Sequence, residues 1–240
     1  MAKLISADLT NNKLCILEYT TIDGQMLSFK EDAFDAKIVS HTYTDIGKII
    51  FDKPITRIGD YAFAWCRSLT SVTIPDSVTT IGDSAFSGCE SLTSVTIGKG
   101  VTKIRECAFS SCESLKSVTI PDSVTTIGKR AFWNCKSLKE FKGKFAADGG
   151  RCLTIDGVLN AFALGCGATQ YTIPDSVTTI GERAFYYCTS LTSVTIPDSV
   201  TTIGEYAFSS CSSLTSVTIP DSVTTIGNYA FASCYSLASV

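Results

Sequence analysis

The sequence predicts an α/β solenoid, a curved horseshoe segment built from seven 23-residue units of strand, turn and short helix. Two repeated motifs carry this prediction. The pattern Ile-Gly-x-x-Ala-Phe-x-x-Cys, with arginine replacing the glycine once, recurs with its isoleucine at Ile58, Ile81, Ile104, Ile127, Ile180, Ile203 and Ile226. These positions are 23 residues apart except for one interval of 53. The octapeptide Pro-Asp-Ser-Val-Thr-Thr-Ile-Gly occurs five times unchanged, which favours a stack of regular repeats.

The unit from 71 to 93 shows how each repeat is expected to fold. Val72 and Ile74 alternate with polar residues, as in a short strand with one apolar face, and Pro75 ends that strand. The later Ala-Phe-x-x-Cys-x-x-Leu run has apolar residues at helical spacing, which predicts a short helix. Each unit thus offers eight core groups, here Val72, Ile74, Val78, Ile81, Ala85, Phe86, Cys89 and Leu92. Burial of these eight groups cannot offset the loss of conformational entropy when 23 residues are ordered. The units must therefore stack.

The two segments without the repeat are expected to be β-structured. Residues 1–47 read as an N-terminal cap with two hairpin-like stretches, at 14–27 around Asp23-Gly24 and at 37–51 around 45–47. Residues 48–240 form the repeat array, interrupted by a 30-residue insertion at 140–169. Asp156-Gly157 lies between two apolar runs of the insertion, which predicts a hairpin that protrudes or packs on a flank.

The repeat resembles a known family. The pattern L-x-x-V-x-I-P-x-x-V-x-x-I-G-x-x-A-F-x-x-C, seen from Leu69 to Cys89, is similar to the BspA-like, or Treponema-type, class of leucine-rich repeats. The similarity covers residues 48–240 apart from the insertion, whose run from Gly150 to Gly157 also resembles a segment of bacterial members. The resemblance implies a leucine-rich-repeat horseshoe that serves as a surface or secreted binding and adhesion module, without catalytic activity.

Composition and motifs argue against several classes of function. The net charge of −3 and the lack of clustered Lys and Arg argue against nucleic acid as a partner. The first 20 residues lack the apolar run of a signal peptide, and no stretch is long enough for a membrane span. His41 is the only histidine and is expected on an exposed strand. Without a nucleophile elbow, a phosphate loop or a zinc motif, neither an enzyme nor a cofactor is predicted.

Cysteines and aspartates each occupy fixed repeat positions. The cysteine ladder comprises Cys66, Cys89, Cys112, Cys135, Cys188, Cys211 and Cys234. The ladder could form a metal or redox wire, but a row of thiolates would need cationic neighbours, which this position lacks. The cysteines are therefore expected to act as small buried hydrophobic side chains. A structural role is also expected for Cys15, Cys107, Cys152 and Cys166. One turn aspartate per repeat, as at Asp76, supplies too few oxygens for calcium, so no metal ligand is predicted.

Two surfaces remain as candidates for binding. The strand face is a uniform Ser/Thr surface, made by Ser71, Thr73, Ser94, Thr96, Ser117, Thr119, Thr172, Ser193, Thr195, Ser216 and Thr218. It lacks large anchoring side chains and reads as a solubilising face. Aromatic and arginine residues collect instead around the Ala-Phe pairs, and the predicted protein-binding residues are Arg130, Trp133, Arg183, Tyr186 and Tyr187. The alternative is that Trp133 and Tyr186 only cover the junction made by the insertion.

Two functions follow from these observations. The first is a non-catalytic leucine-rich-repeat module for protein–protein interaction or cell-surface adhesion, with a host matrix or cell-surface protein as its partner. The second is an intracellular structural or assembly repeat that self-associates through its C-terminal end, where an eighth strand begins at Ser239-Val240 and no capping segment follows.

Overall fold

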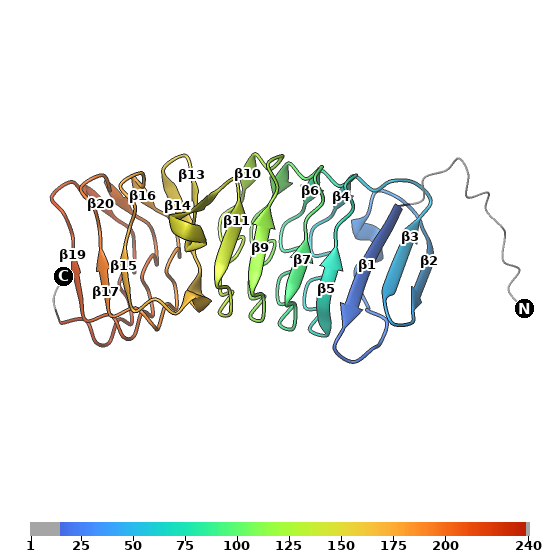
Figure 1. Cartoon of the computed structure of the whole chain (residues 1–240), viewed down its shortest axis with the longest axis horizontal. Coiled ribbons are helices and arrows are strands. Elements are labelled where there is room, and N and C mark those ends of the chain that lie inside the picture. Colours follow the sequence, from blue (N-terminus) through green and yellow to red (C-terminus); the bar gives the residue numbers. More distant parts are fainter. Residues whose placement is uncertain (1–14, 239–240) are drawn as a thin grey trace, which may run out of the picture.

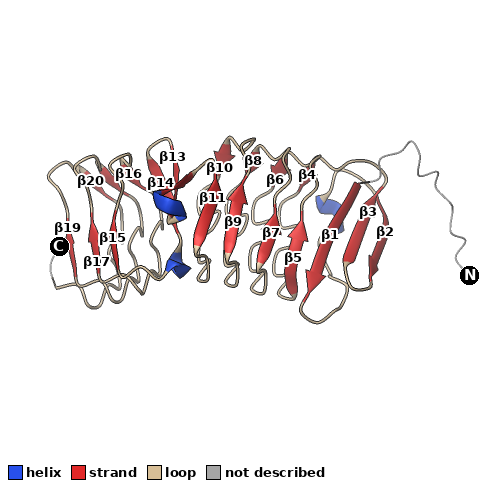
Figure 2. Ribbon diagram, viewed as in Figure 1, coloured by secondary structure: helices blue, strands red, loops and turns tan. Residues whose placement is uncertain are grey.

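The computed structural model describes residues 15–238 as an elongated stack of coils with a small antiparallel sheet at one end (Figure 1). Each 23-residue repeat makes one coil with three sides, which carry a longer strand, a two-residue strand and a run of turns (Figure 2). We call these the strand face, the short-strand side and the turn side. The predicted solenoid of 23-residue units is therefore confirmed. The strand expected at Ser239-Val240 lies outside the described residues.

The strand face holds one parallel strand from each coil, because Pro or Gly follows the alternating Ser-Val-Thr-Ile run and ends it. Its strands are β5 (Leu69–Thr73), β7 (Ser94–Thr96), β9 (Ser117–Ile120), β11 (Glu140–Gly143), β15 (Gln170–Thr172), β17 (Ser193–Thr195) and β19 (Ser216–Thr218). Equivalent residues pair, as Val194 does with Val217. Hydrogen bonding joins β5 to β7, β9 to β11, and β15 to β17 and β19, so this face is divided into three groups.

The short-strand side pairs two-residue strands that end in the repeated isoleucine, and five of these seven strands are the Thr-Ile of the octapeptide. Its strands are β4 (Arg57–Ile58), β6 (Thr80–Ile81), β8 (Lys103–Ile104), β10 (Thr126–Ile127), β16 (Thr179–Ile180), β18 (Thr202–Ile203) and β20 (Thr225–Ile226). The first four form one sheet and the last three belong to another. Threonine hydroxyls reinforce the stack, since Thr102 Oγ1 donates to the Thr79 carbonyl at 3.1 Å and Thr125 Oγ1 to the Thr102 carbonyl at 3.1 Å.

The turn side consists of turns where the sequence predicts a short helix. The described residues contain three 3₁₀ helices and no α-helix, so the α/β assignment is wrong in its helical part (Figure 2). Tyr61 and Trp65 have φ values of 62° and 63°, which a right-handed helix does not allow. Backbone N–H groups alternate between two kinds of acceptor: Ala62 donates within the coil to Gly59, whereas Phe63 donates to Ala85 of the next coil. The apolar spacing that suggested a helix therefore belongs to a run of turns.

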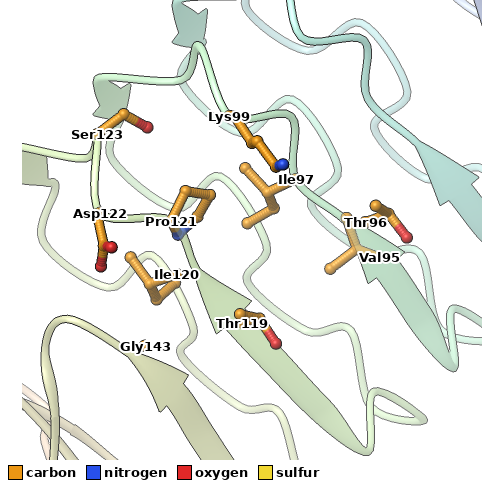
Figure 3. Close-up of a pocket in the computed structure, with 10 residues that line it drawn as sticks. All are labelled: Val95, Thr96, Ile97, Lys99, Thr119, Ile120, Pro121, Asp122, Ser123 and Gly143. Carbon is orange, nitrogen blue, oxygen red and sulfur yellow. The ribbon is translucent and has the colours of Figure 1, made fainter.

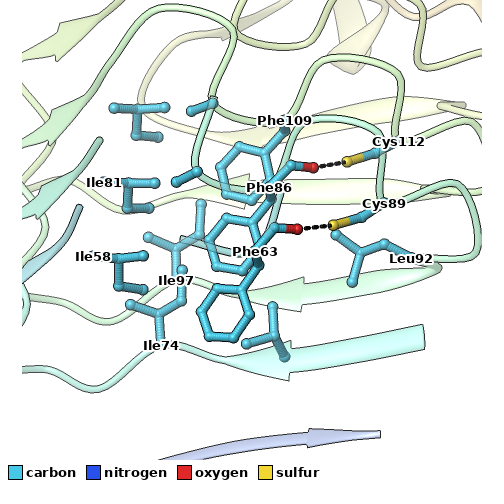
Figure 4. Packing of buried hydrophobic residues seen from close by; sticks show 14 of the residues in the cluster. Ile58, Phe63, Ile74, Ile81, Phe86, Cys89, Leu92, Ile97, Phe109 and Cys112 are labelled. Atoms are coloured by element: carbon cyan, nitrogen blue, oxygen red, sulfur yellow. Dashed lines mark hydrogen bonds between the residues drawn. The ribbon is translucent and has the colours of Figure 1, made fainter. Parts of the chain in front are cut away.

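The core consists of two columns of repeated side chains, which divide within residues 140–169. All eight core groups predicted for the unit 71–93 are buried. Phe63, Phe86 and Phe109 stack nearly parallel, with ring centroids 5.1 and 5.2 Å apart (Figure 4). Beside them the Cys89 Sγ donates to the Phe63 carbonyl oxygen at 3.2 Å, and the Cys112 Sγ to that of Phe86 at 3.3 Å. Each coil thus supplies one ring and one thiol to its neighbour.

The N-terminal segment closes the first coil with an antiparallel sheet. It contains β1 (Cys15–Thr21), η1 (Glu31–Ala33), β2 (Ile38–Tyr43) and β3 (Gly47–Phe51) in the order β2-β3-β1-β5. The hairpin expected at 37–51 is present as β2 and β3. The hairpin expected at 14–27 is wrong, because β1 pairs with β3 and β5 rather than with residues 22–27. Pairing of β1 with β5 covers the strand edge of the first coil.

Residues 140–169 make an expanded coil, which we call the joint coil. After β11 it contains β12 (Ala146–Ala147), η2 (Asp148–Gly150), β13 (Cys152–Ile155), β14 (Val158–Phe162) and η3 (Leu164–Cys166). The predicted hairpin is formed by β13 and β14, but it lies within the stack, because β14 pairs in parallel with β16. Ala161-Phe162 takes the place of an Ala-Phe pair, with the Phe162 ring 4.9 Å from that of Phe185. The short-strand sheet is interrupted between β10 and β14.

Candidate functional site

The five predicted protein-binding residues gather on the turn side at the two edges of the joint coil. Arg130 and Trp133 belong to the coil before it, and Arg183, Tyr186 and Tyr187 to the coil after it. Each lies beside an Ala-Phe pair, where the backbone turns present side chains outward. We call these five residues the joint patch.

Aromatic contacts join the two halves of the patch. The Trp133 and Tyr186 rings have centroids 5.6 Å apart, and Tyr186 and Tyr187 are 5.8 Å apart. Trp133 and Tyr186 are half-buried, whereas Tyr187 is 48% exposed. The indole Nε1–H of Trp133 is buried without a hydrogen-bond acceptor among the described residues. Trp133 and Tyr186 therefore bridge the joint coil, while Tyr187 is open to solvent.

Ion pairs surround the aromatic bridge. Arg130 pairs with Glu106 of the preceding coil, and its Nε lies 3.7 Å from Glu182 Oε1 across the joint coil. Arg183 pairs with Glu182 and lies over the Tyr206 ring, 4.5 Å from its centroid. Burial by itself lowers the pKa of Arg130, but the hydrogen bond to Glu106 and the neighbouring acidic groups outweigh it and raise that pKa. Arg130 thus stays charged and reaches across the joint coil to Glu182, whereas the contacts of Arg183 lie on the far side of that coil.

A shallow cleft lies beside the patch where the short-strand sheet is interrupted. It encloses about 350 Å³, and its lining includes Lys129, Arg130, Asn160, Glu182 and Glu205. The cleft exists because β14 pairs with β16 and not with β10. Charged side chains of both signs therefore line an opening beside aromatic rings that are half-buried or exposed, which is a common composition for a protein-binding surface.

The strand face carries the Ser/Thr surface that the alternation predicts. Thr73, Thr119, Thr195 and Thr218 are exposed, and the serines of the same strands are exposed or half-buried. Sequence reasoning missed a second use of these residue types, which is to join coils. Hydroxyl groups next to the strands donate to carbonyls one coil back, for example that of Thr215 to Thr192 at 3.0 Å. Much of the Ser/Thr repetition is thereby accounted for by stacking.

The cysteine ladder lies inside the core. Six of its seven members are buried and Cys234 is half-buried, and all eleven cysteines of the chain are free thiols. Burial raises the pKa of Cys66 to about 11 and that of Cys135 to about 12, so these groups are protonated at neutral pH. The part of the chain that the structure describes contains no cluster of three or more potential metal-ligating side chains.

His41 departs from its expected exposure. It lies on β2 as expected, but the residue is half-buried, and its Nε2 is 2.7 Å from the Tyr19 hydroxyl. Burial lowers the pKa of His41.

The turn aspartate Asp76 uses its Oδ1 to accept the backbone N–H of Lys99 at 2.8 Å. Across residues 15–238, no helix combines the length and the apolar character that a membrane span needs.

Comparison with known proteins agrees with the coil geometry. The family described as BspA type leucine rich repeat region matches residues 36–146 and 159–240 in six copies. A leucine-rich cell-surface protein of Faecalibacterium prausnitzii superposes with a TM-score of 0.65 at 30% identity, covering 78% of this chain and 63% of that one. The pneumococcal vaccine antigen PcpA gives a TM-score of 0.61 at 21% identity, covering 70% and 49%. No curated protein matches the chain.

The chain therefore spans less than two thirds of the length of these two solved structures. The family match begins again at Leu159, where β14 resumes the regular register after the first half of the joint coil. With 23-residue coils, stacked phenylalanines and a family match over most of its length, the chain belongs to the BspA-type leucine-rich-repeat proteins.

Proposed function

We propose that the protein is a non-catalytic binding module for another protein, and that the joint patch contributes more to binding than the Ser/Thr surface. The observation that carries this proposal is that five large aromatic and arginine side chains meet on one surface. They come from two coils whose equivalent residues, such as Trp133 and Tyr186, are 53 positions apart in the sequence. Trp, Tyr and Arg are the residues that most often dominate the energetics of protein interfaces.

The cell-surface character of the F. prausnitzii relative supports adhesion as the setting of this binding. That protein is described as a leucine-rich cell-surface protein and is 30% identical over the aligned part. We therefore propose that the partner is an extracellular matrix or cell-surface protein. The domain division proposed from the sequence, with a cap over 1–47 and an array over 48–240, places the joint patch within the array and away from the cap.

The test separates binding from the structural role of the bridge. Purified chain is immobilised, and matrix and epithelial surface proteins are passed over it in turn. For a partner so found, Tyr187→Ala and Arg183→Ala are compared with a control set of Thr119→Ala, Thr172→Ala and Thr195→Ala. A hot-spot residue costs about 2 kcal/mol or more, so we expect the dissociation constant to rise about 30-fold for a patch variant.

Trp133→Ala is interpreted only together with its melting temperature, because Trp133 also contacts Tyr186 across the joint coil. Tyr187 serves as the primary reporter, since its ring is exposed and its removal leaves the bridge in place. Binding that is lost with the threonine set and kept by the Tyr187 and Arg183 variants would disprove the assignment of the patch.

The last described coil supports a second candidate, self-association of this chain. Ile226 is 51% exposed and Tyr229 64% exposed, whereas Ile203 one coil earlier is fully buried. Sedimentation velocity over a range of concentrations tests this candidate. We expect Ile226→Thr to reduce any association, because it removes apolar area from the exposed end. A wild-type chain that is monomeric at all concentrations would exclude this candidate.

A further inference from the structure

A second opening lies on the strand face, on a different side of the stack from the joint patch. The strand sheet is interrupted between β7 and β9, since β7 pairs with β5 and β9 with β11. The opening encloses about 520 Å³, within the usual range of ligand pockets, and apolar side chains line most of it. Figure 3 shows these residues on neighbouring coils: Val95, Ile97, Ile120 and Pro121 form the walls, with Thr96 and Thr119 beside them.

A departure from the repeat explains the opening. Where most coils have Pro-Asp-Ser after the strand, this coil has Gly98-Lys99-Gly100. A Cβ at Gly98 would lie 2.3 Å from the Pro75 carbonyl oxygen, and one at Gly100 would lie 2.0 Å from that of Asp76. Only glycine permits such an approach, so this turn lies tightly against the coil before it. The coil after it is left without a partner for its strand.

Strand pairing elsewhere on this face is continuous, in contrast to the interruption between β7 and β9. The consecutive Pro-Asp-Ser coils of β15, β17 and β19 form one continuous ladder, and Val194 and Val217 within it are buried. Val95, the equivalent residue of β7, is only half-buried. The partial exposure of Val95 therefore results from the Gly98-Lys99-Gly100 turn and not from a feature that all coils share.

The backbone of β7 adds polar groups to the apolar walls. Ile74 donates its N–H to the Thr96 carbonyl at 2.9 Å, so Thr96 directs its backbone groups toward β5. Neighbouring residues of a parallel strand direct theirs to opposite sides, so the N–H and C=O of Val95 point toward β9, to which β7 is not hydrogen-bonded. The opening thus combines apolar contact surface with one donor and one acceptor of peptide geometry.

Two charges of opposite sign complete the opening. Lys99 and Asp122 are exposed on the neighbouring turns at one end of it (Figure 3). Neither side chain forms an ion pair with another described residue. A ligand that matched this end would carry a negative and a positive group on the two sides of an apolar group.

We propose that this opening binds an extended peptide segment of a partner protein, with one bulky apolar side chain inserted between β7 and β9. The main-chain amide of that residue pairs with Val95, and flanking acidic and basic side chains pair with Lys99 and Asp122. The proposal relies on the protein-binding function only for the source of the peptide. Its site is independent of the joint patch.

The first experiment uses defined peptides and the folded full chain. Methyl resonances of Val95, Ile97 and Ile120 are followed while N-acetyl-tryptophanamide, or an acetylated and amidated tripeptide, is added. The tripeptides have tryptophan at the centre and serine on both sides, glutamate before and lysine after, or the reverse charge order. We expect all four probes to shift the three resonances, and one charge order to bind more tightly than the serine peptide at low salt only.

Two variants of different kinds test the site. Restoring the common turn with Gly98→Pro, Lys99→Asp and Gly100→Ser moves the turn away from the preceding coil and closes the opening. Val95→Phe fills the opening from its wall and leaves the turn unchanged. Either variant should weaken peptide binding at least about tenfold. The matched control, Thr195→Phe on the continuous part of the same face, should bind as the wild type does.

The outcomes separate this proposal from its alternatives. Shifts with 3-methylindole as large as those with the amide would mean a site for small apolar molecules, and the peptide assignment would be overturned. Absence of shifts in a folded chain would mean that β7 and β9 close in solution, and the site itself would be overturned. Neither result affects binding at the joint patch, which the Tyr187 and Arg183 variants report separately.

Discussion

Ile203 and Ile226 allow the energy of stacking to be measured directly. The two residues occupy the same place in identical octapeptides, yet Ile203 is fully buried and Ile226 is 51% exposed. Replacing a fully buried isoleucine with alanine costs about 2–5 kcal/mol, because apolar contact is lost and a cavity remains. At Ile226 about half of that contact is present and no closed cavity forms, so the expected cost is about 1 kcal/mol. The difference is the contribution of the following coil.

Urea unfolding followed by far-ultraviolet circular dichroism measures both costs. With a denaturant slope of about 3 kcal/mol per molar, Ile203→Ala should lower the midpoint by about 1 M and Ile226→Ala by about a third of that. Ser199 and Ser222 provide the matched control, since each donates to a valine carbonyl of the preceding coil, at 2.8 and 2.9 Å. Their alanine variants should cost the same. Equal costs at the two isoleucines would refute the view that each coil is stabilised by the next.

Three further outcomes are expected. A thiol reagent at neutral pH should modify the half-buried Cys107, Cys166 and Cys234 in the folded chain and reach the eight buried cysteines only in urea; rapid reaction of all eleven would contradict the core assignment. Because burial lowers the pKa of His41, the unfolded chain binds the proton more readily, so stability should fall as the pH drops below about 6.5, and His41→Gln should remove that dependence. Ser210 has a φ of 63°, so Ser210→Gly should raise stability by about 0.5–1 kcal/mol, whereas glycine at the buried Ser209 should lower it; a loss at both positions would mean that the left-handed turn is not strained.

The repeat period and the core could be predicted because they are properties of spacing. A 23-residue interval requires equivalent residues to stack, and the alternation around Val72 and Ile74 determines which side chains point inward. The helix could not be distinguished from turns in this way, since Ala85, Phe86 and Cys89 have spacing that fits both. The deciding feature is a left-handed backbone at two positions per coil, and only one of those positions, Gly88, is a glycine.

The candidate surfaces were predictable only in part. The sequence indicated which aromatic and arginine residues differ between repeats, but not that 53 residues of chain return Tyr186 to within reach of Trp133. The interval of 53 residues predicts an insertion because the Ala161-Phe162 pair of this segment lacks the preceding Ile-Gly and is followed by cysteine one residue later than in other units. The Gly98-Lys99-Gly100 departure is visible in the sequence, whereas its effect on β7 and β9 depends on contacts between coils.

The direction of the hydrogen bonds between coils also determines how the molecule responds to force. The cap and the last coil lie at opposite ends of the stack, and the strands run across its long axis (Figure 1). A pull between the ends therefore acts along the hydrogen bonds and opens one coil interface at a time, instead of shearing many bonds together. Each coil that detaches releases 23 residues, up to about 80 Å of extended chain. Under such a pull the described stack should lengthen in equal steps of one coil, with a longer step for the 30 residues of the joint coil.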